Sequence, residues 1–350
     1  MSVFYVIVAI LIFGVLVAVH EFGHFSAAKL CGVRVEEFAI GMGPAIWKKQ
    51  KGETLYSLRA VPFGGYCAMT GEDGASDDPR AFGNQKLWKR LLILVAGSFN
   101  NFLLGFVVVL VLQLSYGMVM SPAVASFMEG CPYDSADGLQ VGDRFLRING
   151  HRIDMYSDVI RYLDGDGDYD LEVERDGETV RLENFRLERK DYADGRFFGF
   201  RFGLMEKAGL WQNLRASWEQ TTDYVKLVWE SLGMLLSGKA GVNDLAGPVG
   251  IVDLMAESSA QQETLRAGLE VIFTFGAFIA VNLAVMNMLP IPALDGGRVF
   301  LLLVTALIET ITRKKIDPKY EGYIHAAGMV LLLALMGYVL LHDIFRLVRA

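Results

Sequence analysis

Long apolar runs dominate the hydropathy pattern of this 350-residue chain. A helix needs about 20 consecutive apolar residues to cross roughly 30 Å of hydrocarbon. Four runs of about this length lie at residues 3–28, 91–114, 269–288 and 325–341, and a shorter apolar helix is predicted at residues 298–312. The pattern therefore predicts a polytopic α-helical membrane protein with about four transmembrane helices.

The segment between the first two runs has a strand pattern. Residues 33–69 alternate in polarity and carry turn residues and aromatics, which is typical of a β-hairpin or small sheet. The stretch at residues 63–66 is apolar and glycine-rich. Irregular backbone enters a membrane only where it packs on protein or lines a water-filled cavity. We therefore expect a membrane-associated hairpin that dips toward whatever site the spans enclose.

The segment between the second and third runs, residues 117–262, has the composition of a globular insert. Alternating strands flank Asp176-Gly177, a strong hairpin signal, and residues 155–163 are compatible with a helix. These features predict a small β-rich module with one helix.

The end of this insert is different again. Residues 207–236 have apolar side chains at helical spacing, including Trp211, Trp218 and Trp229. An amphipathic helix on the outer membrane face is one interpretation, and a helix packed against the spans is the other.

Composition and charge narrow the class of protein. Hydrophobic residues make up 53% and charged residues 21%, which fits membrane helices combined with a soluble insert. The formal net charge of −7 argues against nucleic acid as a partner. The three cysteines lie far apart and form no CxxC pair, so neither a disulfide framework nor a thiolate zinc site is indicated. No Lys or Arg precedes Lys29, so we interpret the first run as a retained span rather than a signal peptide.

Basic residues predict the orientation in the membrane. They gather in the loops after the first and third runs, and such flanks favour the cytoplasm. Both termini and the long insert are then expected on the outer side. The residues that carry this prediction are Lys48, Lys49, Lys51, Arg59, Lys86, Lys89, Arg90, Arg313, Lys314, Lys315 and Lys319.

The first run contains the sequence HEFGH at residues 20–24. His20 and His24 are four residues apart on a helix, so both imidazoles lie on one face and can hold one Zn²⁺. Glu21 stands where a carboxylate can take a proton from water at the metal. Ionisable side chains inside a membrane span are expensive and mark a functional site by default. The motif therefore predicts a zinc protease site within the membrane.

A catalytic zinc site needs a third protein ligand. The best candidate is Asp295, a lone carboxylate in the proline-broken stretch NMLPIPALDGG at residues 287–297. The alternative is that Asp295 merely caps the helix that follows it.

Together these motifs make the chain resemble the site-2 protease family of intramembrane zinc metalloproteases, in particular its RseP type. HEFGH in a first span and NxxPxPxLDG in a late span carry the likeness. Further matching stretches are GGYCAMTGE at 64–72, AGSFNNF at 96–102, GPVGI at 247–251 and a PDZ-like DGLQVGDRFLRINGHRI at 137–153. The chain departs from the family pattern in two ways: Ser98 stands where Pro is usual, and only one PDZ-like copy fits.

The resemblance implies a role for each matching residue. His20, His24 and Asp295 match the zinc ligands of the family, with one Zn²⁺ per chain, and Glu21 matches its catalytic glutamate. The residues that match substrate-positioning segments are Asn287, Pro290, Pro292, Gly64 and Gly65.

The resemblance also implies a domain plan. Residues 1–116 would form an N-terminal membrane core, 117–205 an extracytoplasmic PDZ-like domain, 206–262 an amphipathic linker helix with the GPVG segment, and 263–350 a C-terminal membrane core.

The function implied is regulated intramembrane proteolysis in a bacterial inner or plasma membrane. Substrates would be single-span membrane proteins, such as anti-sigma factors or remnant signal peptides, and the enzyme is expected to be a lipid-embedded monomer. The alternative is a catalytically silent membrane scaffold that binds peptides through the PDZ-like module. The intact HExxH motif and Asp295 argue against that alternative, because a scaffold needs neither.

Overall fold

The chain forms two compact units, Met1–Val109 with Gln220–Ala350 and Leu110–Glu219. The computed structural model describes residues 2–72, 74, 76–192, 195–239, 247–313, 322–334 and 337.

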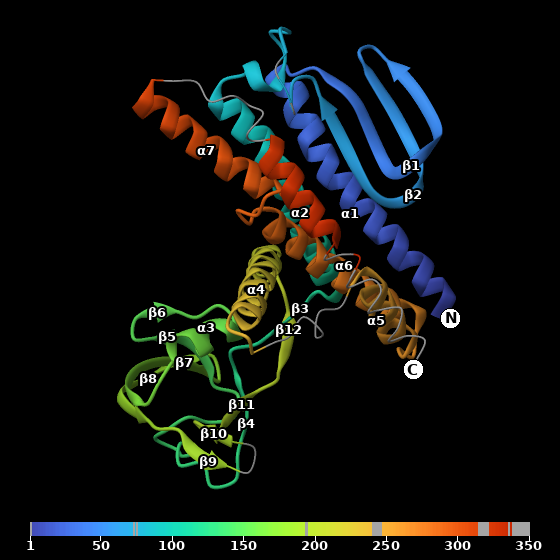
Figure 1. Cartoon of the computed structure of the whole chain (residues 1–350). Coiled ribbons are helices and arrows are strands. Elements are labelled where there is room, and N and C mark those ends of the chain that lie inside the picture. Colours follow the sequence, from blue (N-terminus) through green and yellow to red (C-terminus); the bar gives the residue numbers. More distant parts are fainter. Residues whose placement is uncertain are drawn as a thin grey trace. The chain divides into compact units, whose positions relative to one another are not determined.

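Three helices in the described part of the chain are long and apolar enough to cross a membrane: α1 (Ser2–Cys31), α2 (Leu87–Tyr116) and α6 (Leu265–Asn287) (Figure 1). They confirm three of the four predicted spans, and each helix begins one to four residues earlier than its predicted run. The fourth predicted run, residues 325–341, lies partly outside the described residues. Its described part belongs to a shorter apolar helix, Gly322–Ala334.

The spanning helices expose large apolar side chains, as lipid contact requires. Leu11, Phe99 and Phe273 are 63%, 58% and 42% exposed. Such surfaces are unusual on soluble proteins and mark contact with a membrane or a partner. On their inner sides the helices pack around a buried core that includes Leu16, Met255 and Ile272.

Two further helices complete the first unit. Helix α5 (Pro248–Ala260) packs against α1 and α6. Helix α7 (Asp295–Thr312) is the short apolar helix predicted after the third run, and it begins three residues earlier than predicted. Leu302 of α7 joins a buried cluster with Ala28 of α1 and Leu94 of α2.

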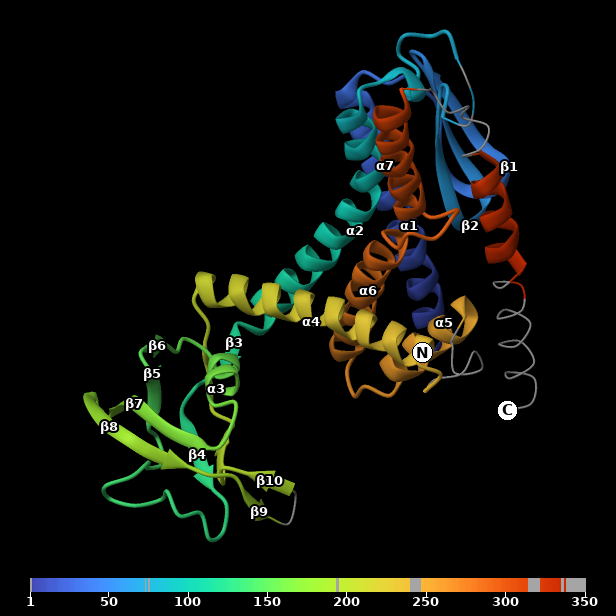
Figure 2. The same cartoon turned by 60° about the vertical axis from the view of Figure 1, so that its left-hand side comes forward.

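The predicted hairpin is confirmed between α1 and α2. Strand β1 (Val35–Lys51) pairs antiparallel with β2 (Thr54–Met69), and the register shifts at several places along the pair. Each shift bends the ribbon and increases its twist. The hairpin lies along α1 in Figures 1 and 2, with β2 in contact with that helix.

The second unit is the predicted β-rich module. Its main sheet has four strands in the order β6-β5-β7-β8, and three two-stranded pairs accompany it. Asp176 and Gly177 connect β7 to β8 with φ of 52° and 83°, the left-handed pair that a tight hairpin turn requires. The strands are β3 (Met118–Met120), β4 (Val124–Phe127), β5 (Arg144–Ile148), β6 (His151–Arg152), β7 (Gly167–Arg175), β8 (Glu178–Leu187), β9 (Lys190–Tyr192), β10 (Gly195–Phe197), β11 (Phe200–Phe202) and β12 (Met205–Lys207).

One helix belongs to this module, and a second begins in it. Helix α3 (Tyr156–Tyr162) confirms the helix predicted at residues 155–163. Helix α4 (Leu210–Leu236) confirms the helix predicted at residues 207–236, and its tryptophans are more than half exposed. Within the module, Arg215 of α4 pairs with the buried Asp158 of α3.

Candidate metal centre

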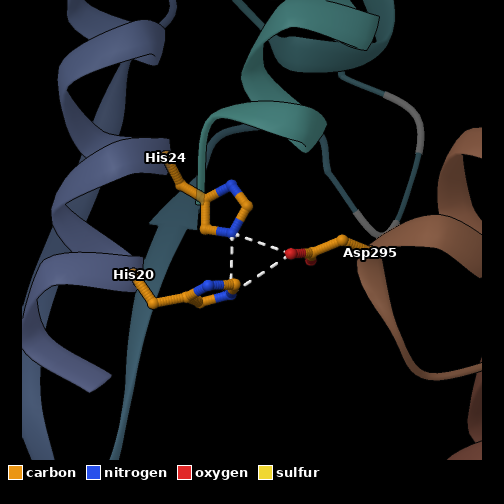
Figure 3. Close-up of side chains that lie close together, drawn as sticks. All are labelled: His20, His24 and Asp295. Atoms are coloured by element: carbon orange, nitrogen blue, oxygen red, sulfur yellow. Dashed lines mark hydrogen bonds and ion pairs between the residues drawn. The ribbon is translucent and has the colours of Figure 1, made fainter. Parts of the chain in front are cut away.

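His20, His24 and Asp295 converge at one point between α1 and α7 (Figure 3). The two Nε2 atoms are 3.3 Å apart, and each lies 3.2 Å from Oδ2 of Asp295. His24 is buried, and the other two side chains are mostly shielded from solvent. The cluster is the one group of His, Cys, Asp and Glu side chains in the described part of the chain that could hold a metal ion.

The spacing of these three atoms fits zinc. Bonds of about 2.0–2.1 Å at tetrahedral angles separate neighbouring donor atoms by about 3.3–3.4 Å. Among the described residues, Asp295 Oδ2 is buried and has no hydrogen-bond partner, although two imidazole nitrogens are within 3.2 Å. A buried carboxylate oxygen without such a partner is costly unless a cation binds there. These three donors would leave one position of a tetrahedral zinc ion open, as in catalytic zinc sites.

The turn between α6 and α7 delivers Asp295 to the histidines. Helix α6 ends at Asn287, and α7 has Leu294 as its N-cap, so Asp295 does not occupy the capping position. A Cβ atom on Gly296 would lie 2.2 Å from Met288 O. A Cβ atom on Gly297 would lie 2.1 Å from Ile291 O. Only glycine lets the turn fold this tightly onto the start of α7.

Helices α1 and α2 are in close contact beside the two histidines. A Cβ on Gly97 would lie 2.3 Å from His24 Nε2, and one on Gly23 would lie 2.3 Å from Ala96 O. The two helices therefore approach backbone to backbone, a contact that small residues permit in membranes. Sequence reasoning missed both glycines, although their place in HEFGH and AGSFNNF offered a signal.

The sequence also matches a family of known proteins. A sequence profile of peptidase family M50 matches residues 8–335. The chain belongs to peptidase family M50, the site-2 protease family.

Relatives cover the protease nearly end to end. A protein of Clostridium acetobutylicum, named as a candidate zinc metalloprotease, is 36% identical over 98% of both chains. The zinc metalloprotease RasP of Shouchella clausii is 28% identical over 97% of this chain and 98% of its own. The regulator of sigma-W protease RasP of Bacillus subtilis is 27% identical over 98% of both. The protein is therefore a zinc metalloprotease of the site-2 type, and its apolar helices place it in a membrane.

In the M50 protease, the hairpin passes beside the residue predicted to be catalytic. A Cβ on Gly65 would lie 3.0 Å from Glu21 Cγ, so β2 and the HEFGH turn of α1 are in direct contact. Gly64 has φ of 83° and faces Met42 of β1. Of the two glycines predicted near the substrate, Gly65 therefore lies next to Glu21, whereas Gly64 lies against β1.

A charged side chain links the two strands of the hairpin. Glu37 of β1 accepts hydrogen bonds from Ser57 Oγ at 2.7 Å and Arg59 Nη2 at 2.8 Å, both in β2. Partial burial opposes ionisation of Glu37, but these donors outweigh it and hold the pKa of its carboxyl below the usual range. The carboxylate therefore stays charged and ties the strands together at neutral pH.

The other predicted substrate-positioning residues take different places. Asn287 is the last residue of α6, and its Nδ2 lies 3.5 Å from His20 Nε2. Pro290 is exposed at the turn. Pro292 packs against Gly328 of helix Gly322–Ala334, where an added Cβ would lie 2.4 Å from the proline ring.

Two more contacts hold the turn and α7, and neither was predicted. Arg298 of α7 forms an ion pair with Glu72, which follows β2. His325 Nδ1 accepts a hydrogen bond from Ala293 N at 3.2 Å. Both contacts join segments far apart in sequence, so only the fold reveals them.

Proposed function

We propose that this protein is an intramembrane endopeptidase that cuts single-span membrane proteins by regulated intramembrane proteolysis. The observation that carries the proposal is the trio of donor atoms, spaced 3.2–3.3 Å apart, that α1 and α7 bring together. In this proposal His20, His24 and Asp295 hold one zinc ion per chain. When bound, zinc acidifies water toward neutral pH and polarises a peptide carbonyl.

Glu21 is proposed as the general base. It follows His20 directly on α1, so its carboxylate belongs to the same turn as the ligands. It takes a proton from the attacking water and delivers that proton to the leaving amine. The contact of Gly65 with Glu21 Cγ supports this role, because it puts a polypeptide-binding element beside the base.

Asn287 is proposed to position the scissile peptide. Its amide nitrogen lies 3.5 Å from His20 Nε2, so the side chain reaches the edge of the metal position. From there an N–H can donate to the carbonyl oxygen as negative charge develops on it. Pro290 and Pro292 are proposed to shape the turn that carries this amide.

The hairpin is proposed to hold the substrate extended. A substrate helix satisfies its own backbone groups and must unwind before a carbonyl reaches the metal. Pairing with an edge of the β1–β2 ribbon at Gly64-Gly65 would accept the unwound strand. Proline at Val61 or Trp47, both exposed, should then lower cleavage and leave zinc content unchanged. Unchanged cleavage by both variants would exclude strand addition.

The finer organisation is proposed on the same basis. The module at residues 117–205 is a PDZ-like domain that docks or sizes the outer end of the substrate, and residues 206–262 form an interfacial linker. A fourth span completes the core at residues 263–350, and both termini lie outside the cytoplasm. Anti-sigma factors are proposed as substrates because a relative is named as a regulator of sigma-W protease, and remnant signal peptides are proposed as a second class.

The test is Glu21→Gln in the full chain reconstituted in lipid vesicles with a single-span reporter. The amide keeps the shape of the side chain but cannot take the proton, so zinc content should remain and cleavage should disappear. Glu230→Gln, at an exposed position of α4 outside the PDZ-like module, is the matched control and should cleave normally. Full cleavage by Glu21→Gln would remove Glu21 from the mechanism.

A further inference from the structure

Asn101 is a buried polar side chain in the middle of the apolar helix α2. It is 1% exposed, and its Oδ1 is buried with no hydrogen-bond partner among the described residues. Its Nδ2 lies 3.5 Å from Nδ1 of His20. Polar groups inside a membrane helix are expensive, so an amide kept there calls for a specific partner.

The hydrogen-bond partner of Asn101 follows from which ring nitrogen of His20 must carry the hydrogen. Nε2 of His20 is the atom that faces Nε2 of His24 and Oδ2 of Asp295. A metal at that point requires a bare Nε2, and a neutral imidazole then has its hydrogen on Nδ1. Nδ1 therefore needs an acceptor, and Asn101 is the side chain beside it.

Asn101 can supply that acceptor with a rotation of its amide. Turning the group by 180° exchanges Oδ1 and Nδ2 with little change in shape. The carbonyl oxygen that has no hydrogen-bond partner then faces the Nδ1 hydrogen of His20. The arrangement parallels His24, whose Nδ1 donates to Ile93 O at 2.8 Å on the same helix.

We propose that Asn101 is a positioning residue that accepts the Nδ1 hydrogen of His20 and holds Nε2 toward the metal. This rests on the proposed role of His20 as a ligand. Helix α2 then orients both imidazoles, one through a backbone carbonyl and one through a side chain. Asn287 does not compete for this role, because its amide lies on the Nε2 side of the ring.

The experiment measures zinc affinity by chelator competition on the purified full chain, together with the thermal stability of the metal-free protein. Asn101→Leu removes the acceptor at similar volume, and it should weaken zinc binding by about 10- to 100-fold, the range for lost partners of metal-bound histidines. Asn101→Asp keeps an acceptor oxygen and should bind zinc at least as tightly as the unaltered chain. Asn100→Leu, one residue away on the same helix, is the control and should leave affinity unchanged.

The outcomes separate the two proposals. Unchanged affinity in Asn101→Leu overturns the positioning role, and so does a loss in Asn101→Asp as large as that in Asn101→Leu. If Asn101→Leu fails to fold, Asn101→Asp still tests the proposal through its zinc affinity relative to the unaltered chain. His20→Ala serves as the reference for the ligand: if that variant keeps full zinc affinity, the proposed metal site itself is wrong, whatever Asn101 does.

Discussion

The two halves of the proposed metal centre are built in different ways. His20 and His24 belong to one continuous helix, so a single local spacing places both imidazoles on one face. Asp295 follows a turn, and its place depends on where α6 ends and on what α7 packs against. Helix geometry therefore sets one half of the centre, and tertiary contacts set the other.

This difference predicts where the centre is most easily damaged. The spacing of the histidines survives any movement of α1 as a rigid body. Asp295 moves whenever the turn or α7 moves. Small changes around residues 288–298 should therefore affect zinc binding more than changes of similar size around α1.

The largest effect is expected for Gly296→Ala, because the new methyl group would lie 2.2 Å from the backbone oxygen of Met288. Backbone cannot yield as a side chain can, so the turn must open and carry Asp295 away. Overpacking of this kind costs about 1–3 kcal/mol, which corresponds to zinc binding weakened by about 5- to 150-fold. Chelator competition measures it. Gly233→Ala is the control, since nothing lies within 4 Å of its added methyl group. Normal zinc affinity in Gly296→Ala would show that the turn does not fix Asp295.

A smaller loss is expected on the helical half from Gly97→Ala. Its methyl group would lie 2.3 Å from Nε2 of His24, so the ring must move away, which a side chain does more readily than the backbone that Gly296→Ala displaces. We expect zinc affinity to fall by about fivefold, the lower end of the overpacking range. If Gly97→Ala weakens zinc binding more than Gly296→Ala does, the contrast between the two halves is wrong.

The smallest effect is expected from the ion pair between Glu72 and Arg298. Both side chains are partly exposed, at 15% and 31%, so solvent screens much of their attraction. Glu72→Gln and Arg298→Met should each lower kcat/KM a few-fold by loosening α7. A double-mutant cycle should give a coupling of about 0.5–1 kcal/mol. The same substitutions at Glu270 and Arg266, an i,i+4 pair near the start of α6, should leave kcat/KM unchanged. Additive effects at Glu72 and Arg298 would mean that their pairing does not hold α7.

The same contrast explains what the sequence could predict. The first three spans, the hairpin at residues 33–69 and the Asp176-Gly177 turn follow from local patterns, and the structure contains all of them. Asp295 could be singled out as a lone carboxylate after two prolines and favoured as a ligand, but capping remained the local alternative until its place beside the histidines was known.

The remaining contacts of the centre depend on pairs of segments that no local pattern joins. Gly97 matters because His24 lies against it. Arg298 matters because it forms an ion pair with Glu72. His325 reaches the turn by accepting a hydrogen bond from Ala293 N. Such side chains look ordinary in sequence, since their meaning comes from the partner that the fold supplies.

The central claim is that Asp295 joins the two histidines on one zinc ion. X-ray absorption at the zinc edge, combined with metal analysis, tests it directly on the purified chain and on Asp295→Ala. The account predicts one zinc per unaltered chain, bound by two imidazoles and light oxygen donors at about 2.0–2.1 Å. In Asp295→Ala it predicts that zinc is lost, or that what remains has one protein oxygen donor fewer. An identical zinc content and ligand shell in the two proteins would contradict it.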